Sequence, residues 1–471
     1  MRVAFVQNVW FDNLGPIGLA EILERQGHQV RFFLEDRSWV KRIVEWAPHV
    51  VALSATTGNH LPMLKMAEIA RSAVTPRPVV ILGGPHATFF PEVIHHPALD
   101  AICRGEGDLA LPQFLAEMEG GGLPEKIPNF WIKKDGVILK NEIGPLVVNL
   151  DDIPFPRRTP LYSEYRFRRN YPVKTTVSSR GCPFGCIYCY NNIYKKMVRG
   201  KGPYVRRRSV SHLMEELLYL HKTYGFRSLE ILDDIFTMDK AWTLDFAREY
   251  ARKIRLPYAV LSSPGFLDPE IIEALKDSNC QWIAFGIENG DENIRRTILK
   301  KPFLNEDYRE LAGMIKKAGI RIQTFNMVGL PGETVEKAME TVRLNQEIRA
   351  DYAWCSMVQP YPGTELAEIC LKQGLLREED LEWGGIASKS IYDQGMIQNE
   401  EGASLSNLQK LFPLMVWFPA LEPLFRLLIR LPPNPLFRYV HQATLGWQVK
   451  RRGKIRLLET LEIYRRFARH Y

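Results

Sequence analysis

The most informative stretch of this chain runs from Ser178 to Tyr190 and reads SSRGCPFGCIYCY. It places Cys182, Cys186 and Cys189 at a C-x3-C-x2-C spacing. The glycines and the proline of this stretch let a short backbone turn tightly, so that all three sulfurs can point inward. An iron–sulfur cube normally takes four thiolates, and three leave one iron open to another ligand. The stretch therefore predicts a [4Fe-4S] cluster with one open iron on these three cysteines.

The alternatives for this loop are a zinc site or a set of buried structural thiols. Zinc usually takes four ligands, often from two C-x2-C pairs, and the chain has no second pair. The aromatic Tyr188 stands immediately before the last cysteine. With it, the loop resembles the C-x3-C-x-aromatic-C signature of radical S-adenosylmethionine (radical SAM) enzymes. That resemblance implies that the three cysteines ligate the cluster and that Tyr188 lies beside the cofactors.

Short apolar runs alternate with helical patterns over the first part of the chain. The runs are Val3–Gln7, Val30–Leu34, Val50–Ser54, Val79–Leu82 and Ala101–Cys103. Continuous apolar strands that alternate with helices indicate a parallel sheet covered on both faces, which is a Rossmann-like, doubly wound fold. Such sheets bind ligands beyond the carboxyl ends of their strands. We therefore expect a ligand site where these runs end.

Small polar residues follow three of these runs, at residues 54–58, 83–88 and 105–108. They allow a bulky planar ligand to approach the backbone, and the alternative is that they only form tight turns. Their order, with Gly-Gly-Pro-His-Ala-Thr and then Gly-Glu-Gly-Asp, is similar to the cobalamin-binding domain that precedes many radical SAM enzymes. The resemblance implies cobalamin contacts from Ser54, Thr56, Gly83, Gly84, His86, Thr88, Gly105 and Glu106.

One motif of many other cobalamin proteins, D-x-H-x-x-G, is missing from this sequence. No histidine has an aspartate two positions before it. The cobalt would then have no histidine beneath it. His86 is a candidate ligand, but a backbone contact, a corrin-propionate contact or a role in the turn is favoured.

Six further strand patterns alternate with helical patterns between Lys174 and Gln359. They cover residues 174–178, 229–232, 259–261, 282–286, 321–327 and 352–359. Six such units predict a partial (β/α)6 barrel, and in barrels of this kind chemistry occurs at the carboxyl ends of the strands. The cysteine loop follows the first of these strands, which is where a barrel would place it.

Polar residues or glycine follow four of these barrel strands. Asp233 and Asp234 follow the second strand, Ser262 the third, Glu288 the fourth and Val328-Gly329 the fifth. These positions look like the elements of radical SAM enzymes that bind S-adenosylmethionine. The resemblance implies that Glu288 binds the ribose hydroxyls and that the Val328-Gly329 backbone lies against the adenine. A helix N-cap or a solvated surface group is the alternative for each acid. No catalytic side chain is assigned.

These patterns predict a cobalamin-binding domain at residues 1–145, a linker at 146–173, the barrel at 174–375 and a mostly helical region at 376–471. The last region is apolar from Leu411 to Leu431, but three prolines, Glu422 and two arginines interrupt it before the end. A spanning helix needs about 20 mostly uncharged residues, so contact with a membrane surface is favoured over spanning. A helical cap that packs on the barrel and closes the active site is slightly favoured over membrane contact. A basic helix is predicted over residues 455–464.

The net charge and the use of cysteine indicate which cellular compartment and which partners suit the chain. The net charge is +8, and the segment 426–471 carries eleven Lys or Arg against two acids. The chain shows neither a secretory leader nor a disulfide framework, so we expect a cytoplasmic protein, and peripheral contact at the inner membrane surface stays open beside the helical cap.

Together the two resemblances imply an enzyme that cleaves S-adenosylmethionine reductively and uses cobalamin to methylate an unactivated carbon. The expected substrate is a small molecule or a lipid-like compound, and the expected electron donor is a flavodoxin or ferredoxin. Cobalamin-dependent cyclisation or ring rearrangement without methyl transfer is the alternative. A tRNA methylthiotransferase is disfavoured, because that family carries extra amino-terminal cysteines and only Cys103 precedes Cys182 here. No nucleic-acid partner is expected.

Overall fold

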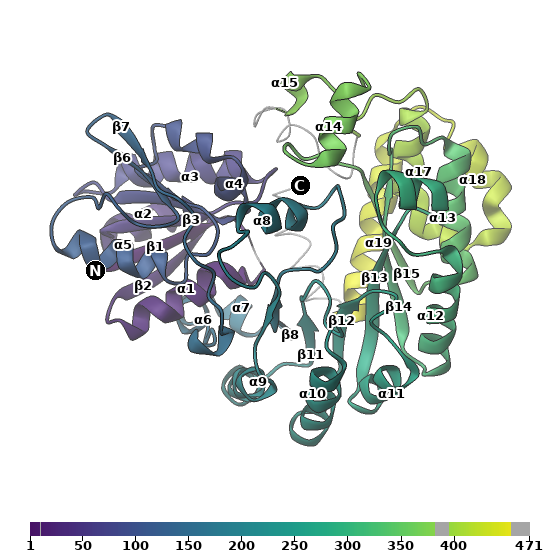
Figure 1. Cartoon of the computed structure of the whole chain (residues 1–471), viewed down its shortest axis with the longest axis horizontal. Helices are drawn as coiled ribbons and strands as arrows, with labels where there is room; N and C mark the ends of the chain where they lie inside the picture. Colours follow the sequence, from purple (N-terminus) through teal and green to yellow (C-terminus); the bar gives the residue numbers. More distant parts are fainter. Residues whose placement is uncertain (10, 382–394, 454–471) are drawn as a thin grey trace. The chain divides into compact units, whose positions relative to one another are not determined.

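The computed structural model describes residues 1–9, 11–381 and 395–453. The chain divides into two compact units (Figure 1). The first comprises Met1–Tyr171 and Lys195–Gly225, and the second comprises Pro172–Tyr194 and Phe226–Tyr471. The first unit therefore includes most of the predicted linker and a segment that returns to it after the cysteine loop. The domain limits given above remain predictions.

The first unit contains a seven-stranded sheet in the order β2-β1-β3-β4-β5-β6-β7. Strands β1 to β5 are parallel, whereas β6 and β7 form an antiparallel hairpin at one edge. The five predicted strands are thus confirmed, and their carboxyl ends share one edge. The strands are β1 (Arg2–Gln7), β2 (Gln29–Leu34), β3 (Val50–Ser54), β4 (Val79–Gly83), β5 (Ala101–Cys103), β6 (Phe130–Lys134) and β7 (Val137–Lys140).

Helices cover both faces of this sheet, because alternate residues of β1 enter two separate cores. Val3 and Phe5 pack with α1 and α5, while Ala4 and Val6 pack with α2, α3 and α4. This two-sided burial explains the continuous apolar strands and confirms the predicted doubly wound fold. The covering helices are α1 (Leu14–Arg25), α2 (Trp39–Trp46), α3 (His60–Ala73), α4 (Gly84–Phe89) and α5 (Ala110–Glu119).

A buried network of ion pairs joins the linker and helix α9 (Val210–Tyr224) to this unit. Arg158 lies 2.9 Å from Glu216, and Arg208 lies 2.6 Å from the other oxygen of that carboxylate. Arg168 pairs with Asp12 in the loop after β1. Burial alone would raise the pKa of Asp12, but Arg168 and Arg158 outweigh it and lower the pKa. The linker helices α6 (Thr159–Glu164) and α7 (Arg166–Arg169) are positioned by these contacts.

The second unit contains six parallel strands in the order β15-β14-β13-β12-β11-β8. Sequential order and parallel pairing match the predicted partial barrel, and all six predicted strands are present. Four helices that follow its strands are α10 (Lys240–Lys253), α11 (Pro269–Asp277), α12 (Asn305–Lys317) and α13 (Val335–Glu347). The strands are β8 (Val173–Thr176), β11 (Ser228–Ile231), β12 (Tyr258–Ser262), β13 (Cys280–Glu288), β14 (Arg321–Val328) and β15 (Tyr352–Met357).

Within residues 376–381 and 395–453, the carboxyl-terminal region is mostly helical, as predicted. Helix α17 (Gly402–Trp417) packs against β15 and α13, and the amide of Gln409 donates a hydrogen bond to the Cys355 carbonyl at 2.9 Å. No helix in the described part of the chain is long and apolar enough to cross a membrane. The predicted basic helix at 455–464 lies outside the described residues. The other helices here are α14 (Glu365–Lys372), α15 (Glu378–Leu381), α18 (Glu422–Leu428) and α19 (Pro435–Gly453).

Candidate functional site in the second unit

The cysteine loop begins directly after β8 and is fixed at its start by Asp233. The Asp233 carboxylate accepts a hydrogen bond from the Ser178 backbone N–H at 2.6 Å and another from the Ser178 hydroxyl. Asp233 is buried at the end of β11 and does not line the neighbouring pocket. Its carboxylate therefore positions the loop, and its predicted contact with a cofactor remains a prediction.

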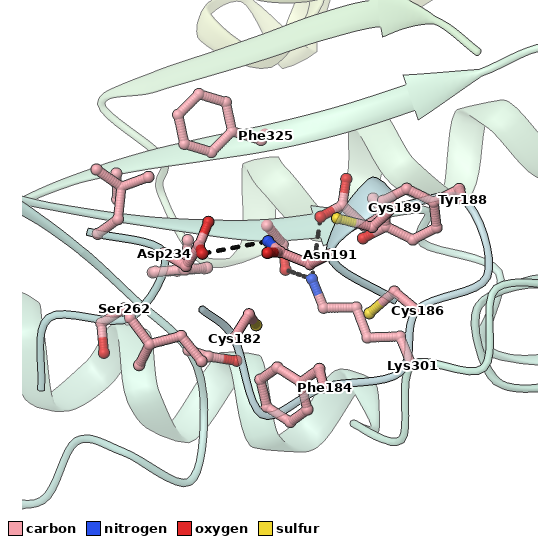
Figure 2. A pocket seen from close by; sticks show the side chains of 17 residues that line it. Cys182, Phe184, Cys186, Tyr188, Cys189, Asn191, Asp234, Ser262, Lys301 and Phe325 are labelled. Carbon is pink, nitrogen blue, oxygen red and sulfur yellow. Dashed lines mark hydrogen bonds and ion pairs between the residues drawn. The ribbon is translucent and has the colours of Figure 1, made fainter. Parts of the chain in front are cut away.

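The three thiols open into one pocket of about 240 Å³ at the carboxyl ends of the strands (Figure 2). Cys182, Cys186 and Cys189 are half-buried, and burial raises the pKa of each, that of Cys182 to about 11. Bound iron would offset that effect, because a coordinating thiol is deprotonated. No other cysteine is among the described residues that line the pocket. Three thiols at one pocket fit a cluster with one open iron, and the ligation of iron by these three cysteines remains a prediction.

Glu288 lies in the same pocket, held by Lys301. The Lys301 Nζ is 3.0 Å from the Glu288 carboxylate and donates to the Gly286 carbonyl at 2.6 Å (Figure 2). Glu288 has a left-handed backbone at φ +68°, where the pairing of β13 with β14 shifts register. Gly286 leaves room for the pair, because a Cβ there would lie 1.9 Å from a Glu288 oxygen. The strand end is therefore built around this ion pair.

Tyr188 connects the cysteine loop to this pair. Its hydroxyl hydrogen-bonds to Glu288, and burial, then the charge of Glu288, raise the pKa of Tyr188 well above its ordinary value. Tyr188 therefore remains a protonated phenol whose position depends on Glu288. Lys301 was not predicted from the sequence, because it lies in a loop after β13 and belongs to no motif.

Hydroxyl and carboxylate groups line the rest of the pocket. Ser262 bonds to the Thr237 hydroxyl, whereas the buried hydroxyl of Ser263 has no partner among the described residues. Asp234 accepts a hydrogen bond from the Asn191 amide at 3.1 Å. Burial, followed by the charge of Asp233, raises the pKa of Asp234. These groups can hydrogen-bond to the hydroxyl and amino N–H groups of S-adenosylmethionine, and a buried hydroxyl without a partner among the described residues fits a missing ligand.

Val328 and Gly329 are at the end of β14, and neither lines the pocket. The Glu333 carboxylate accepts hydrogen bonds from the backbone N–H groups of Gly329 and Leu330, at 2.6 and 3.0 Å. It also accepts one from the Asn289 amide at 2.5 Å. Burial raises the pKa of Glu333 to about 7. Glu333 thus links the ends of β13 and β14, and the adenine contact of Val328-Gly329 remains a prediction.

In the first unit, the residues predicted to contact cobalamin pack the loops at the carboxyl ends of β3, β4 and β5 against one another. The Thr88 hydroxyl donates to the Gly84 carbonyl and accepts from the Gly105 N–H, both at 2.9 Å. Gly84 has φ +88°, and a Cβ there would lie 2.6 Å from the Ser54 hydroxyl. Only glycine fits at that crossing. Gly83 ends β4, and Thr56 is exposed after β3.

His86 and Glu106 hold this edge together from within. The His86 ring is fully buried, with its centroid 3.8 Å from that of His60, and burial lowers its pKa to about 3. Glu106 pairs with Arg206 at 2.7 Å and accepts from the Val147 N–H at 3.1 Å. Because the His86 ring is fully buried, it agrees with the prediction that no histidine lies beneath the cobalt of the corrin. Direct ligand contacts by these two residues remain predictions.

Two family models match the chain. Residues 176–344 match the radical SAM superfamily, and residues 12–115 match the B12 binding domain. The chain therefore combines a B12-binding domain with a radical SAM domain. It belongs to the cobalamin-binding radical SAM enzymes, and its cofactors are a [4Fe-4S] cluster, S-adenosylmethionine and cobalamin.

Relatives and solved structures agree with this assignment. The chain is 29% identical over 373 residues to an uncharacterised methyltransferase of Pyrococcus horikoshii, covering 77% of this chain and 79% of the relative. It is 25% identical over 392 residues to hopanoid C-3 methylase of Methylococcus capsulatus, covering 75% and 68%. The fold resembles that of the radical SAM methyltransferase TsrM from Kitasatospora setae with cobalamin and a [4Fe-4S] cluster bound. The TM-score is 0.67 at 16% identity, covering 80% of this chain and 76% of TsrM.

Proposed function

We propose that the protein methylates an unactivated carbon of a small-molecule or lipid-like substrate. The observation that carries the proposal is one pocket that gathers three thiols, two carboxylates and an unpartnered hydroxyl. The same chain contains a B12-binding domain. The names of the two curated relatives, a methyltransferase and a C-3 methylase, support methyl transfer as the outcome.

Each group of the pocket has a defined task in this proposal. Cys182, Cys186 and Cys189 hold the cluster and leave one iron for the amino and carboxylate groups of S-adenosylmethionine. When bound, the cluster supplies the electron that splits S-adenosylmethionine into methionine and a 5′-deoxyadenosyl radical, and cobalamin supplies the methyl group. Glu288 and Asp234 accept hydrogen bonds from the ribose hydroxyls or from the N–H groups of the bound S-adenosylmethionine.

The apolar part of the pocket protects the radical. The lining includes Phe184, Ile235, Leu261 and Phe325, whose hydrocarbon side chains cannot hydrogen-bond to water and so help to keep it out of the site. Expelling water from such a site prevents side reactions of a reactive intermediate. Figure 2 shows Phe184 and Phe325 on opposite sides of the cysteines and of Asp234.

The test is a product analysis with methyl-deuterated S-adenosylmethionine. The full-length protein is reconstituted anaerobically with iron, sulfide and cobalamin, reduced with dithionite, and given a cell extract as the source of substrate. A product with a deuterated methyl group is expected, with 5′-deoxyadenosine and S-adenosylhomocysteine formed in equal amounts. Formation of 5′-deoxyadenosine without S-adenosylhomocysteine or label would refute methylation and favour cyclisation or rearrangement.

The proposal also names an electron donor and a compartment. A flavodoxin or ferredoxin delivers the electron, and the protein acts in the cytoplasm at the inner membrane surface.

RNA methylthiolation is disfavoured, because Cys103 lies in the core of the first unit. Burial, then the charge of Asp108, raises the pKa of Cys103 to about 12, which makes it a poor ligand for a second cluster.

A further inference from the structure

Helix α18 presents apolar side chains on two faces, of which only one is buried. Phe425 and Ile429 face the interior, 5% and 1% exposed. Four leucines spaced three or four residues apart lie on the outer side and form what we call the leucine face. They are Leu421, Leu424, Leu427 and Leu431, with 45, 49, 64 and 46% of their surface exposed.

The leucine face is held in place by the rest of the second unit. Arg426 pairs with Glu336 on α13. The Asn407 amide on α17 donates to the Leu431 carbonyl at 2.6 Å and to the Ile429 carbonyl at 3.2 Å. Figure 1 shows α18 beside α13 and α17, at the outer edge of this unit. Leu424 and Leu427 therefore belong to a helix that is fixed on the second unit, and Leu421 and Leu431 lie directly before it and three residues after it.

A groove at the end of α17, next to the Phe418-Pro419 segment that leads into α18, adds aromatic and cationic groups. It has a volume of about 930 Å³, and its lining includes Trp417, Phe418, Trp447, Arg349 and Arg451. The Arg451 guanidinium lies 5.1 Å from the centre of the Trp447 ring. Aromatic side chains with one polar edge, next to arginines, are typical of protein groups at a membrane–water interface.

The charge of this region identifies what it binds. Between Phe418 and Gly453 the sequence has six Lys or Arg and one acid, Glu422. Arg426 pairs with Glu422 at 2.9 Å and with Glu336 on α13, and the one acid among the described residues that line the groove, Asp351, pairs with Lys316, so the cations of the region still outnumber its acids. Two copies of such a surface repel each other, so it is unsuited to self-association. An anionic lipid surface offers both an apolar layer for the leucines and negative headgroups for the cations.

We propose that the leucine face and the adjoining groove bind the surface of an anionic lipid bilayer. The leucines enter the boundary between headgroups and acyl chains, and Arg349, Arg451 and their neighbours contact lipid phosphates. This binding does not depend on the proposed methylation, and it adds residues and a lipid charge to the expected peripheral contact.

Sedimentation of the full-length protein with vesicles tests this inference. One set of vesicles contains phosphatidylcholine alone, and the other contains phosphatidylcholine mixed with phosphatidylglycerol. Binding to the mixed vesicles is expected, with weakening at high salt. The double variant Leu424→Ser/Leu427→Ser should bind at least about tenfold more weakly, because two apolar side chains no longer leave water.

The matched control is Leu109→Ser, because Leu109 is 66% exposed in the first unit, outside the leucine face. This variant should bind vesicles like the unaltered protein. Circular dichroism and iron content confirm that each variant is folded. Three results would overturn the proposal: no binding to mixed vesicles, equal binding to both kinds of vesicle, or unchanged binding by the double variant. A dimer in solution that the double variant abolishes would assign the face to a second copy instead.

Discussion

The variant Lys301→Met leaves the Glu288 carboxylate in the pocket without its positively charged partner. The side chains of Lys301 and Glu288 are 8% and 12% exposed, and their charged atoms are 3.0 Å apart. In Lys301→Met, the Glu288 carboxylate stays buried without its cation. Breaking a buried ion pair in this way lowers the free energy of unfolding by about 3–5 kcal/mol. We expect about 3 kcal/mol, since Glu288 also bonds to Tyr188.

A second variant shows how much of the lost stability comes from the missing ion pair and how much comes from the unpaired Glu288 carboxylate. Lys301→Met/Glu288→Gln removes both charges, so no carboxylate is left unpaired. Replacing both partners of a buried pair is often nearly neutral. We therefore expect the double variant to recover roughly 2 kcal/mol relative to Lys301→Met. This recovery would show that most of the loss comes from the unpaired carboxylate.

Urea unfolding under anaerobic conditions, followed by circular dichroism, measures these differences. The control is Lys316→Met, which removes a lysine paired with Asp351 where the two side chains are 31% and 20% exposed. Solvent screens that pair, so the control should lose less than about 1 kcal/mol. The reasoning is wrong if Lys301→Met is as stable as the control. It is also wrong if the double variant is less stable than Lys301→Met.

Three further predictions concern other buried groups. Burial raises the pKa of Glu333 to about 7. The folded protein therefore keeps the proton on the Glu333 carboxyl up to a higher pH than the unfolded chain does. The free energy of unfolding should fall by up to about 3 kcal/mol as pH rises from about 4.5 to 7. Urea unfolding across this range should show a flatter pH dependence for Glu333→Gln, and an unchanged slope would contradict the assignment. Cys182→Ala should lose the iron and sulfide of the reconstituted protein by chemical analysis, whereas Cys370→Ala, in the core, should retain them. Glu216→Gln should lower the free energy of unfolding by about 3 kcal/mol, because two buried arginines share that carboxylate, while the exposed neighbour Glu215→Gln should change it by less than about 0.5 kcal/mol. Equal effects of these last two changes would contradict the ion-pair network.

Local patterns predicted the parts of the site that depend on short spacing. The cysteines are close in sequence, so their shared pocket followed from one loop. Glu288 was predicted from its place after a strand. For Asp233 and Asp234 the sequence showed two adjacent acids but not which of them faces the pocket. Successive side chains at a strand end point to opposite sides, and only Asp234 lines the pocket.

Contacts between distant segments could not be predicted from the sequence. Lys301 reaches Glu288 because the chain after β13 folds back over the strand end, and no residue pattern marks that turn. Glu106 has a carboxylate in a segment rich in small polar residues, which suggested a ligand contact. The structure pairs it with Arg206, one hundred residues further along the chain. Only the tertiary fold brings such partners together.

The division of the chain into interleaved units has a consequence for how the enzyme can be cut, fused or inherited. The polypeptide passes from one unit to the other at 171–172, again at 194–195 and a third time at 225–226. A fragment that begins at Pro172 would lack Arg158, one of the two arginines that pair with Glu216 on α9, and a fragment that ends at Tyr171 would lack α9 itself. Recombination at a single site therefore cannot replace the whole of one unit and leave the other unit unchanged. Both ends of the segment that carries the three thiols are tethered to the corrin-binding half, so the two halves must evolve as one piece.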